Sequence, residues 1–152
     1  MKNFRKDAKI ASVLIVAALL VSQAFRIQKS NPPVHSDISA DPAVKSLMRR
    51  ACYNCHSNET VWPWYSNVAP VSWLVANDVH EARRMMNFSE WGTYDRQKQS
   101  HKLTAIAEKM EDGSMPPWYY SMMHAESRLK PAERDQIRAW SLSAREPLSP
   151  SR

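Results

Sequence analysis

The stretch ACYNCHSNETVWPWYSNVAP, residues 51–70, contains both cysteines of a 152-residue chain. Cys52 and Cys55 are three residues apart, and His56 follows the second cysteine directly. For two cysteines placed at random in a chain with five histidines, the chance of this arrangement is roughly one in two thousand. The spacing therefore indicates a site that needs two thiols and an imidazole close together.

This pattern, C-x-x-C-H, is the attachment signature of c-type haem. Both thiols form thioether bonds to the vinyl groups of the ring, and the histidine ligates the iron. The two sulfurs must reach neighbouring edges of one ring while the next residue turns under the metal. The sequence thus predicts one covalently bound haem c, with Cys52 and Cys55 as attachment sites and His56 as the proximal ligand.

Three weaker alternatives remain open for the two thiols. A zinc site needs further thiolates or paired histidines, and the four other histidines show no paired spacing. A thioredoxin-type dithiol needs a preceding strand and a βαβ context. A structural disulfide between residues so close in sequence would close too short a loop to stabilise the fold much.

The second axial position of the iron is predicted to be filled by Met115, in the segment EDGSMPPWYY. A glycine precedes it and two prolines follow it, so its loop is restrained, and a thioether ligand raises the reduction potential. The rivals for this position are His80, His124, Met122 and Met123. An iron with an open sixth position is a further alternative.

Aromatic residues crowd the segments around this motif. We predict that several of them form the wall of the haem pocket, namely Trp62, Trp64, Tyr65 and Trp118. The alternative is that they make up the hydrophobic core of a small domain.

Helical signals account for most of the remaining chain, so the fold class is all-α. Asp41 and Pro42 suit the N-cap and first position of a helix. Val71, Val75 and Val79 recur at helical spacing and predict a buried face. Four main helices are expected within residues 41–55, 70–88, 95–113 and 130–142, joined by two long loops over residues 57–70 and 113–130.

The N-terminus carries a basic head followed by an apolar run of sixteen residues, 10–25. This pattern predicts a signal anchor or signal peptide over residues 1–25, and an uncleaved helix is favoured. The chain would then be a single-pass protein of the cytoplasmic (inner) membrane with its haem domain on the periplasmic side. A tether over residues 26–39, a haem-binding domain over 40–144 and a tail over 145–152 follow.

The formal charge of +6 does not indicate a nucleic-acid partner. Residues 1–29 have six basic and one acidic residue, whereas residues 30–152 have fifteen basic and fourteen acidic. The domain itself is nearly neutral and lacks the basic patch of a nucleic-acid binder. The expected partners are the membrane, through the N-terminal helix, and redox proteins; nothing indicates an oligomeric state.

Four blocks carry a family resemblance: CYNCHSNETVWPWYSNVAPVSWLV, NFSEWGTY, GSMPPWYYSMMHAESRL and ERDQIRAW. They resemble the bacterial haem-binding domain family of cytochrome c-like proteins, small exported or membrane-anchored chains with one C-x-x-C-H. The resemblance implies a cytochrome c-like helical fold, and its G-x-M-P segment matches Gly113 to Pro116, which supports Met115. The chain departs from the family at Ala82, where many members have glycine, and at Lys130, where serine is usual.

The predicted function is one-electron transfer by a monohaem c-type cytochrome, with no catalytic residue proposed. Two alternatives depend on an open sixth iron position. One is a peroxidase-like haem enzyme, and the other is a haem-based sensor of a gas or of redox state.

Overall fold

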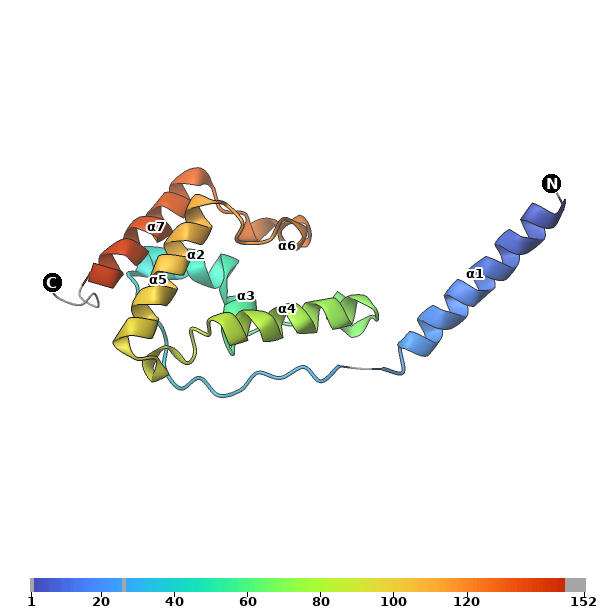
Figure 1. Ribbon diagram of the computed structural model, residues 1–152, viewed down its shortest axis with the longest axis horizontal. Helices are drawn as coiled ribbons and strands as arrows, with labels where there is room; N and C mark the ends of the chain where they lie inside the picture. The colour runs from blue at the N-terminus through green and yellow to red at the C-terminus, as the bar shows by residue number, and fades with distance from the viewer. Residues whose placement is uncertain (1, 26, 147–152) are drawn as a thin grey trace.

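A computed structural model describes residues 2–25 and 27–146 of the chain. Within these ranges the protein is all-helical, as predicted, with no strand and one isolated bridge between Ser36 and Glu90 (Figure 1). The α-helices are α1 (Lys2–Ser22), α2 (Pro42–Ala51), α3 (Tyr53–His56), α4 (Val71–Met85), α5 (Arg96–Glu111), α6 (Trp118–Met123) and α7 (Pro131–Arg145). Three short 3-10 helices are η1 (Trp64–Asn67), η2 (Trp91–Thr93) and η3 (Ala125–Ser127).

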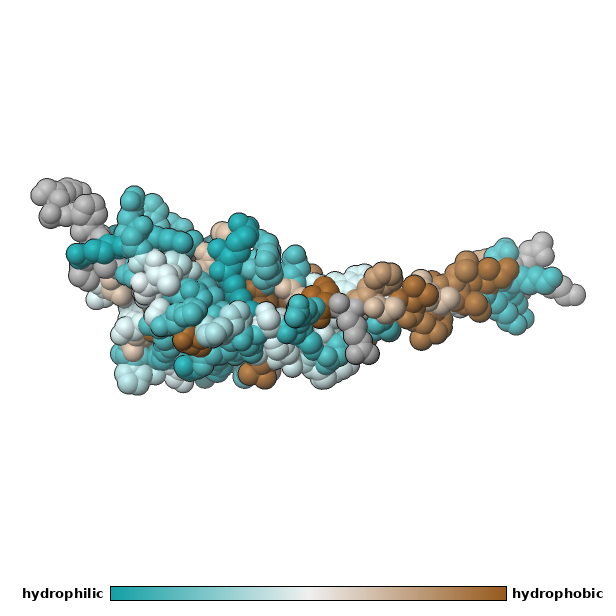
Figure 2. All heavy atoms as spheres, turned by 90° about the horizontal axis from the view of Figure 1, so that it is seen from below, coloured by the Kyte–Doolittle hydropathy of each residue, from teal (hydrophilic) through white to brown (hydrophobic). Residues whose placement is uncertain are grey.

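The prediction of a membrane-spanning N-terminal helix is wrong. Helix α1 exists and extends away from the other helices (Figure 1), but its first turns are hydrophilic (Figure 2). Arg5, Lys6, Asp7 and Lys9 occupy part of its 21 residues, and a span needs about 20 mostly apolar residues. No helix in the described part of the chain is long and apolar enough to cross a membrane. The predicted inner-membrane anchor, and the localisation that rested on it, are therefore not supported.

Helix α2 begins where the sequence predicts. The Asp41 carboxylate accepts hydrogen bonds from the backbone N–H groups of Ala43 and Val44, both at 3.0 Å, and Pro42 occupies the first turn. These bonds satisfy donors that the helix itself cannot. The helix then buries Val44 and Met48, so that its C-terminal end, which leads to Cys52, is held against the core.

Helices α5 and α7 lie side by side and supply much of the core (Figure 1). Leu103, Ile106 and Met110 of α5 are buried, and Ile137 of α7 is only 1% exposed. Gly113 follows α5 with a φ of +70°, a conformation that glycine adopts without strain. The predicted helix end is confirmed, and the chain turns there into the segment that holds Met115.

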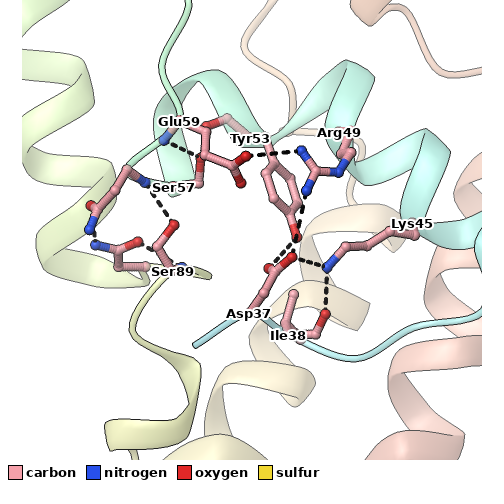
Figure 3. Close-up of polar contacts among 10 residues, drawn as sticks. Asp37, Ile38, Lys45, Arg49, Tyr53, Ser57, Glu59 and Ser89 are labelled. Carbon is pink, nitrogen blue, oxygen red and sulfur yellow. Dashed lines mark hydrogen bonds and ion pairs between the residues drawn. The ribbon is translucent and has the colours of Figure 1, made fainter. Parts of the chain in front are cut away.

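The segment before α2, predicted to be a tether, contacts the domain. Ile38 is 2% exposed, and Asp37 accepts a hydrogen bond from the Tyr53 hydroxyl at 2.6 Å and pairs with Lys45 at 2.6 Å (Figure 3). The Arg49 guanidinium lies over the Tyr53 ring, 4.7 Å from its centroid. These contacts connect the segment to α2 and α3. Most of the tail predicted over residues 145–152 lies outside the described residues.

Arg83 of α4 connects the same N-terminal segment to the loop after the cysteine motif. Its guanidinium donates to the Ser30 carbonyl at 2.8 Å and to Asn31 at 3.0 Å. It also donates to the Ser57 carbonyl and the Thr60 hydroxyl, both at 2.8 Å. One side chain of α4 therefore holds two separate segments against that helix.

Candidate haem site

A single helical turn presents the cysteine motif. The Cys52 N–H donates to the Met48 carbonyl at 2.7 Å, which continues α2, and the His56 N–H donates to the Cys52 carbonyl at 2.9 Å in α3. Residues three and four apart on a helical turn point to the same side. The backbone therefore brings Cys52, Cys55 and His56 onto one face.

Both cysteines are free and partly buried. Burial, with a smaller effect of Cys55, raises the pKa of Cys52 to about 12, and burial, with a smaller effect of Asp78, raises the pKa of Cys55 to about 11. Both groups are consequently neutral thiols at pH 7.

These thiols do not suit the alternatives to haem. Zinc ligands and redox-active cysteines need thiolate character, which a raised pKa opposes. No three His, Cys, Asp or Glu side chains within the described ranges could together hold a metal ion. The strand that a thioredoxin-type motif needs is also missing from this part of the chain.

The His56 ring is prepared as a ligand through Nδ1. This atom lies 3.1 Å from the Ala82 carbonyl oxygen and 3.0 Å from the Met86 carbonyl oxygen. Because a carbonyl can only accept, Nδ1 carries the hydrogen and Nε2 keeps its lone pair. Burial lowers the pKa of His56, which favours the neutral ring. No hydrogen bond to Nε2 occurs among the described residues, so this atom is free to bind a metal.

A cavity of about 400 Å³ lies beside Cys55, within the 300–1,000 Å³ typical of sites for small molecules and cofactors. Its walls come from α3, η1, α4 and α6. They are mostly apolar and include Trp64, Tyr65, Leu74, Tyr119 and Met123. The site is therefore shaped for a bulky apolar group next to a thiol.

Several of these wall residues are unusually exposed for their size. Trp64 is 74% exposed, Met123 61% and Leu74 55%. Soluble domains rarely leave large apolar side chains clustered in water. A flat apolar cofactor seated in the cavity would cover this surface.

The α6 wall is held in place by phenol groups. Asn54 donates to the Tyr120 hydroxyl oxygen at 2.8 Å, and the Tyr119 hydroxyl donates to Asp78 at 3.2 Å. The Tyr65 hydroxyl lies 2.6 Å from His124 Nε2. These bonds connect α6 and the residue after it to α3, α4 and η1, so the wall contacts three other elements.

His124, a rival distal ligand, differs from His56 in its bonding. Its Nδ1 lies 2.9 Å from a Glu126 carboxylate oxygen, so Nδ1 carries the hydrogen and Nε2 accepts from Tyr65. Its ring stacks on Tyr120, with centroids 4.3 Å apart. Both ring nitrogens are therefore engaged, although His124 does line the cavity.

The four predicted pocket residues do not all line the same cavity. Trp64 and Tyr65 line the cavity with Cys55, whereas Trp62 lines a second hollow of about 430 Å³ beside Trp73. Trp118 is 73% exposed and lines neither of the two.

The predicted buried face of α4 is only partly buried. Val79 is 4% exposed, but Val71 is 43% exposed and lines the cavity together with Val75. The helical spacing of these valines was visible in the sequence. What the valines face was not visible, and the cavity residue Leu74 carried no separate signal.

Met115 and Cys52 both pack against the hydrophobic core, and the Met115 carbonyl accepts a hydrogen bond from Arg134 at 2.6 Å. The same arginine acts electrostatically on the Cys52 thiol. Of the predicted haem ligands and attachment sites, only Cys55 lines the cavity, whereas Cys52, His56 and Met115 do not. The role of Met115 as a distal ligand stays a prediction.

Taken together, the turn, the imidazole and the cavity fit a haem. The sequence model of the haem-binding domain family matches residues 14–143, which is most of the chain. The chain belongs to this family and is a haem-binding protein, which confirms the resemblance described above. Searches of curated proteins and of solved structures find no match.

Proposed function

We propose that this domain binds one haem c covalently through Cys52 and Cys55, with His56 as the proximal ligand, and transfers single electrons between redox partner proteins. The observation that carries the proposal is the His56 ring. It is neutral, its Nδ1 is fixed by two carbonyls, and its Nε2 is free on the same helical turn as both thiols.

The two thiols would attach the haem by addition. Each sulfur bonds one carbon of a vinyl group and the thiol hydrogen goes to the other carbon, so no oxidant is consumed. Two free cysteines on one turn are suited to this reaction. Two covalent bonds from one turn would also hold the haem in a single orientation relative to His56.

His56 would tune the iron through the carbonyls behind it. The bound haem supplies the one-electron iron couple. Hydrogen bonds from Nδ1 to Ala82 and Met86 make the ring a stronger donor, and such second-shell bonds adjust a metal site. The apolar wall formed by Leu74 and Met123 would exclude water from the ring.

A second candidate function has its own supporting observation. Met115 does not line the cavity, and both ring nitrogens of His124 are engaged. If neither side chain ligates the iron, its sixth position would be open. Such a site would suit a peroxidase-like enzyme or a sensor of a gas or redox state.

Attachment is tested by producing the full chain with the c-type maturation machinery and extracting it with acidic acetone. Wild type should keep its colour through extraction, and a Cys52→Ser/Cys55→Ser double variant should lose it. His56→Ala should disturb the visible spectrum, whereas His80→Ala, which changes an exposed histidine of α4, should not. A colourless wild type with two free thiols would refute the proposal.

The sixth position is tested by the ferric spectrum of Met115→Leu. If Met115 ligates the iron, the weak charge-transfer band of methionine-ligated haem should be present in wild type and lost in this variant. Met122→Leu is the control, because Met122 is 65% exposed. A high-spin wild-type spectrum that shifts with carbon monoxide would instead support the enzyme or sensor.

A further inference from the structure

A hydrogen-bonded chain starts at Nδ1 of the His56 ring. The Met86 carbonyl that accepts from His56 belongs to the same peptide unit as the Asn87 N–H. That N–H donates to the Tyr94 hydroxyl oxygen at 2.9 Å. A peptide unit is planar, so fixing its N–H also sets the direction of its carbonyl. The chain therefore runs from the His56 ring through one peptide to Tyr94.

This peptide is not held by the helix. Met86 is the C-terminal cap of α4, with an extended backbone at φ −162° and ψ 126°. Beyond a helix end the carbonyls have no helical donor and need other partners. The direction of the Met86 carbonyl must come from the contacts of the residues that follow.

The Asn87 side chain supplies such contacts inside a buried polar network. Its Nδ2 donates to Asn58 Oδ1 at 2.8 Å, and its Oδ1 accepts from the Ser89 N–H at 3.0 Å. The Asn58 N–H in turn donates to the Ser89 hydroxyl at 2.9 Å. All three residues are buried, and Ser89 lies next to the turn that contains Ser57 (Figure 3).

The network lies directly against the proximal histidine. The Phe88 N–H donates to the His56 carbonyl at 2.7 Å, and Asn58 is two residues beyond His56. Residues 86–89 and 56–58 are thus joined by a backbone bond, side-chain bonds and the imidazole itself. A displacement of Asn87 would be passed to the carbonyl at Nδ1.

We propose that Tyr94 and Asn87 are positioning residues that aim the Met86 carbonyl at His56 Nδ1 and thereby help to set the reduction potential of the haem iron. This inference rests on the proposed role of His56 as the proximal ligand. Hydrogen bonds in a chain polarise one another, so the Tyr94 hydroxyl strengthens the donation from Nδ1. A stronger Nδ1 bond makes the imidazole more electron-rich and favours the ferric iron.

The test is the reduction potential of haem-loaded Tyr94→Phe, which loses only one hydroxyl. We expect the potential to rise relative to wild type while the covalent haem content stays unchanged. Tyr53→Phe is the control, because it loses a hydroxyl bond to Asp37 in the same domain without a bond to the Met86 peptide. A rise in Tyr94→Phe alone supports the inference, since destabilisation by itself would affect both.

The reduction potential of Asn87→Ala provides a second, independent test if Tyr94→Phe does not fold. We expect its potential to rise as well, whereas Asn67→Ala, which changes an exposed asparagine of η1, should leave it unchanged. Unaltered potentials in both Tyr94→Phe and Asn87→Ala, with normal haem content, would overturn this inference alone. A wild type without covalent haem would overturn the proposed function, and this inference with it.

Discussion

The two sides of the candidate site differ in how deeply their residues are buried and in how fully they are hydrogen-bonded. Behind His56, Phe88 is 1% exposed and Ser89 is fully buried, and the backbone and side chains bond to one another. In the wall beside Cys55, Trp64 is 74% exposed, and Trp118, which starts α6 outside the cavity, is 73% exposed. We call these the proximal wall, residues 86–89 with α3, and the distal wall, η1 with α6.

This difference indicates how the domain receives its cofactor. The proximal wall sets the ring orientation and the tautomer of His56 with no help from a ligand. The distal wall leaves apolar surface that a haem would cover, and its phenol bonds to Asp78, Asn54 and His124 hold it in position. A histidine held by backbone carbonyls on one side and an exposed apolar surface on the other suit a bulky apolar cofactor.

The largest expected difference between the walls is in hydrophobic packing. Phe88→Ala should lower the free energy of unfolding by about 3–5 kcal/mol, because it opens a cavity in the core beside Tyr53 and His56. Trp118→Ala should change it by less than about 0.5 kcal/mol, as for other surface positions. Denaturant unfolding of the full chain measures both. A large loss in haem-loaded Trp118→Ala would instead indicate the haem contact that the sequence predicts.

A smaller difference is expected when a hydroxyl group is removed from Tyr53, next to Cys52. Its hydrogen bond goes to the Asp37 carboxylate at 2.6 Å (Figure 3). Bonds to charged groups contribute about 1.5–3 kcal/mol, so Tyr53→Phe should lower the free energy of unfolding by that amount. Chemical denaturation with an unchanged slope would show that only stability has changed. A loss below that range would mean that Lys45 alone satisfies Asp37.

The corresponding change in the distal wall should cost less. Tyr65→Phe removes the 2.6 Å bond to His124, and a typical intramolecular hydrogen bond contributes about 0.5–1.5 kcal/mol. The same unfolding measurement applies. If Tyr65→Phe proves more damaging than Tyr53→Phe, the distal wall is as strongly determined as the proximal one, and the comparison fails.

The smallest expected effect is on acid stability. Burial raises the pKa of Asp37, but hydrogen bonds from Lys45 and Tyr53 and the nearby positive charges outweigh it and hold the pKa below the usual 3.8. A carboxyl with a lowered pKa in the folded state stabilises the protein above its unfolded pKa. This stabilisation is lost as the pH falls through the folded pKa.

The thermal midpoint of wild type should therefore fall as the pH drops below about 4, and Asp37→Asn should flatten that part of the profile. Glu126 of η3, which pairs with His124, is the matched control. Its pKa is also lowered, chiefly by a backbone hydrogen bond, but the group is exposed, so Glu126→Gln should have less effect. Equal flattening in the two variants would contradict the contrast between the walls.

Much of the helical architecture could be predicted because its signals are local. Asp41 and Pro42 mark the start of α2, and Gly113 marks the end of α5. The membrane anchor was predicted from an apolar run of residues, but the helix that forms there includes the charged head as well. Hydropathy alone did not define the bounds of that helix, and the prediction failed for this reason.

The site was predictable only where side chains carry the signal. Cys52, Cys55 and His56 are identified by their spacing, and Trp64 and Tyr65 by their aromatic character. In the structure His56 and Tyr65 make hydrogen bonds at the site, and Cys52 and Cys55 have raised pKa values. The carbonyls of Ala82 and Met86 could not be predicted, because every residue has a carbonyl. Tyr94 gave no signal either, since its hydroxyl acts through a peptide unit of a distant segment.

By itself, the sequence determined the haem motif, the helical turn that presents it and the caps of the main helices, because each depends on residues within a few positions of one another. The tertiary structure decided which nitrogen of His56 is free, where the cavity lies and that Val71 and Val75 face it. These properties depend on how α3 packs against α4 and on the place of α6 in the wall of the cavity. Contacts between distant segments have no local pattern that a sequence could display.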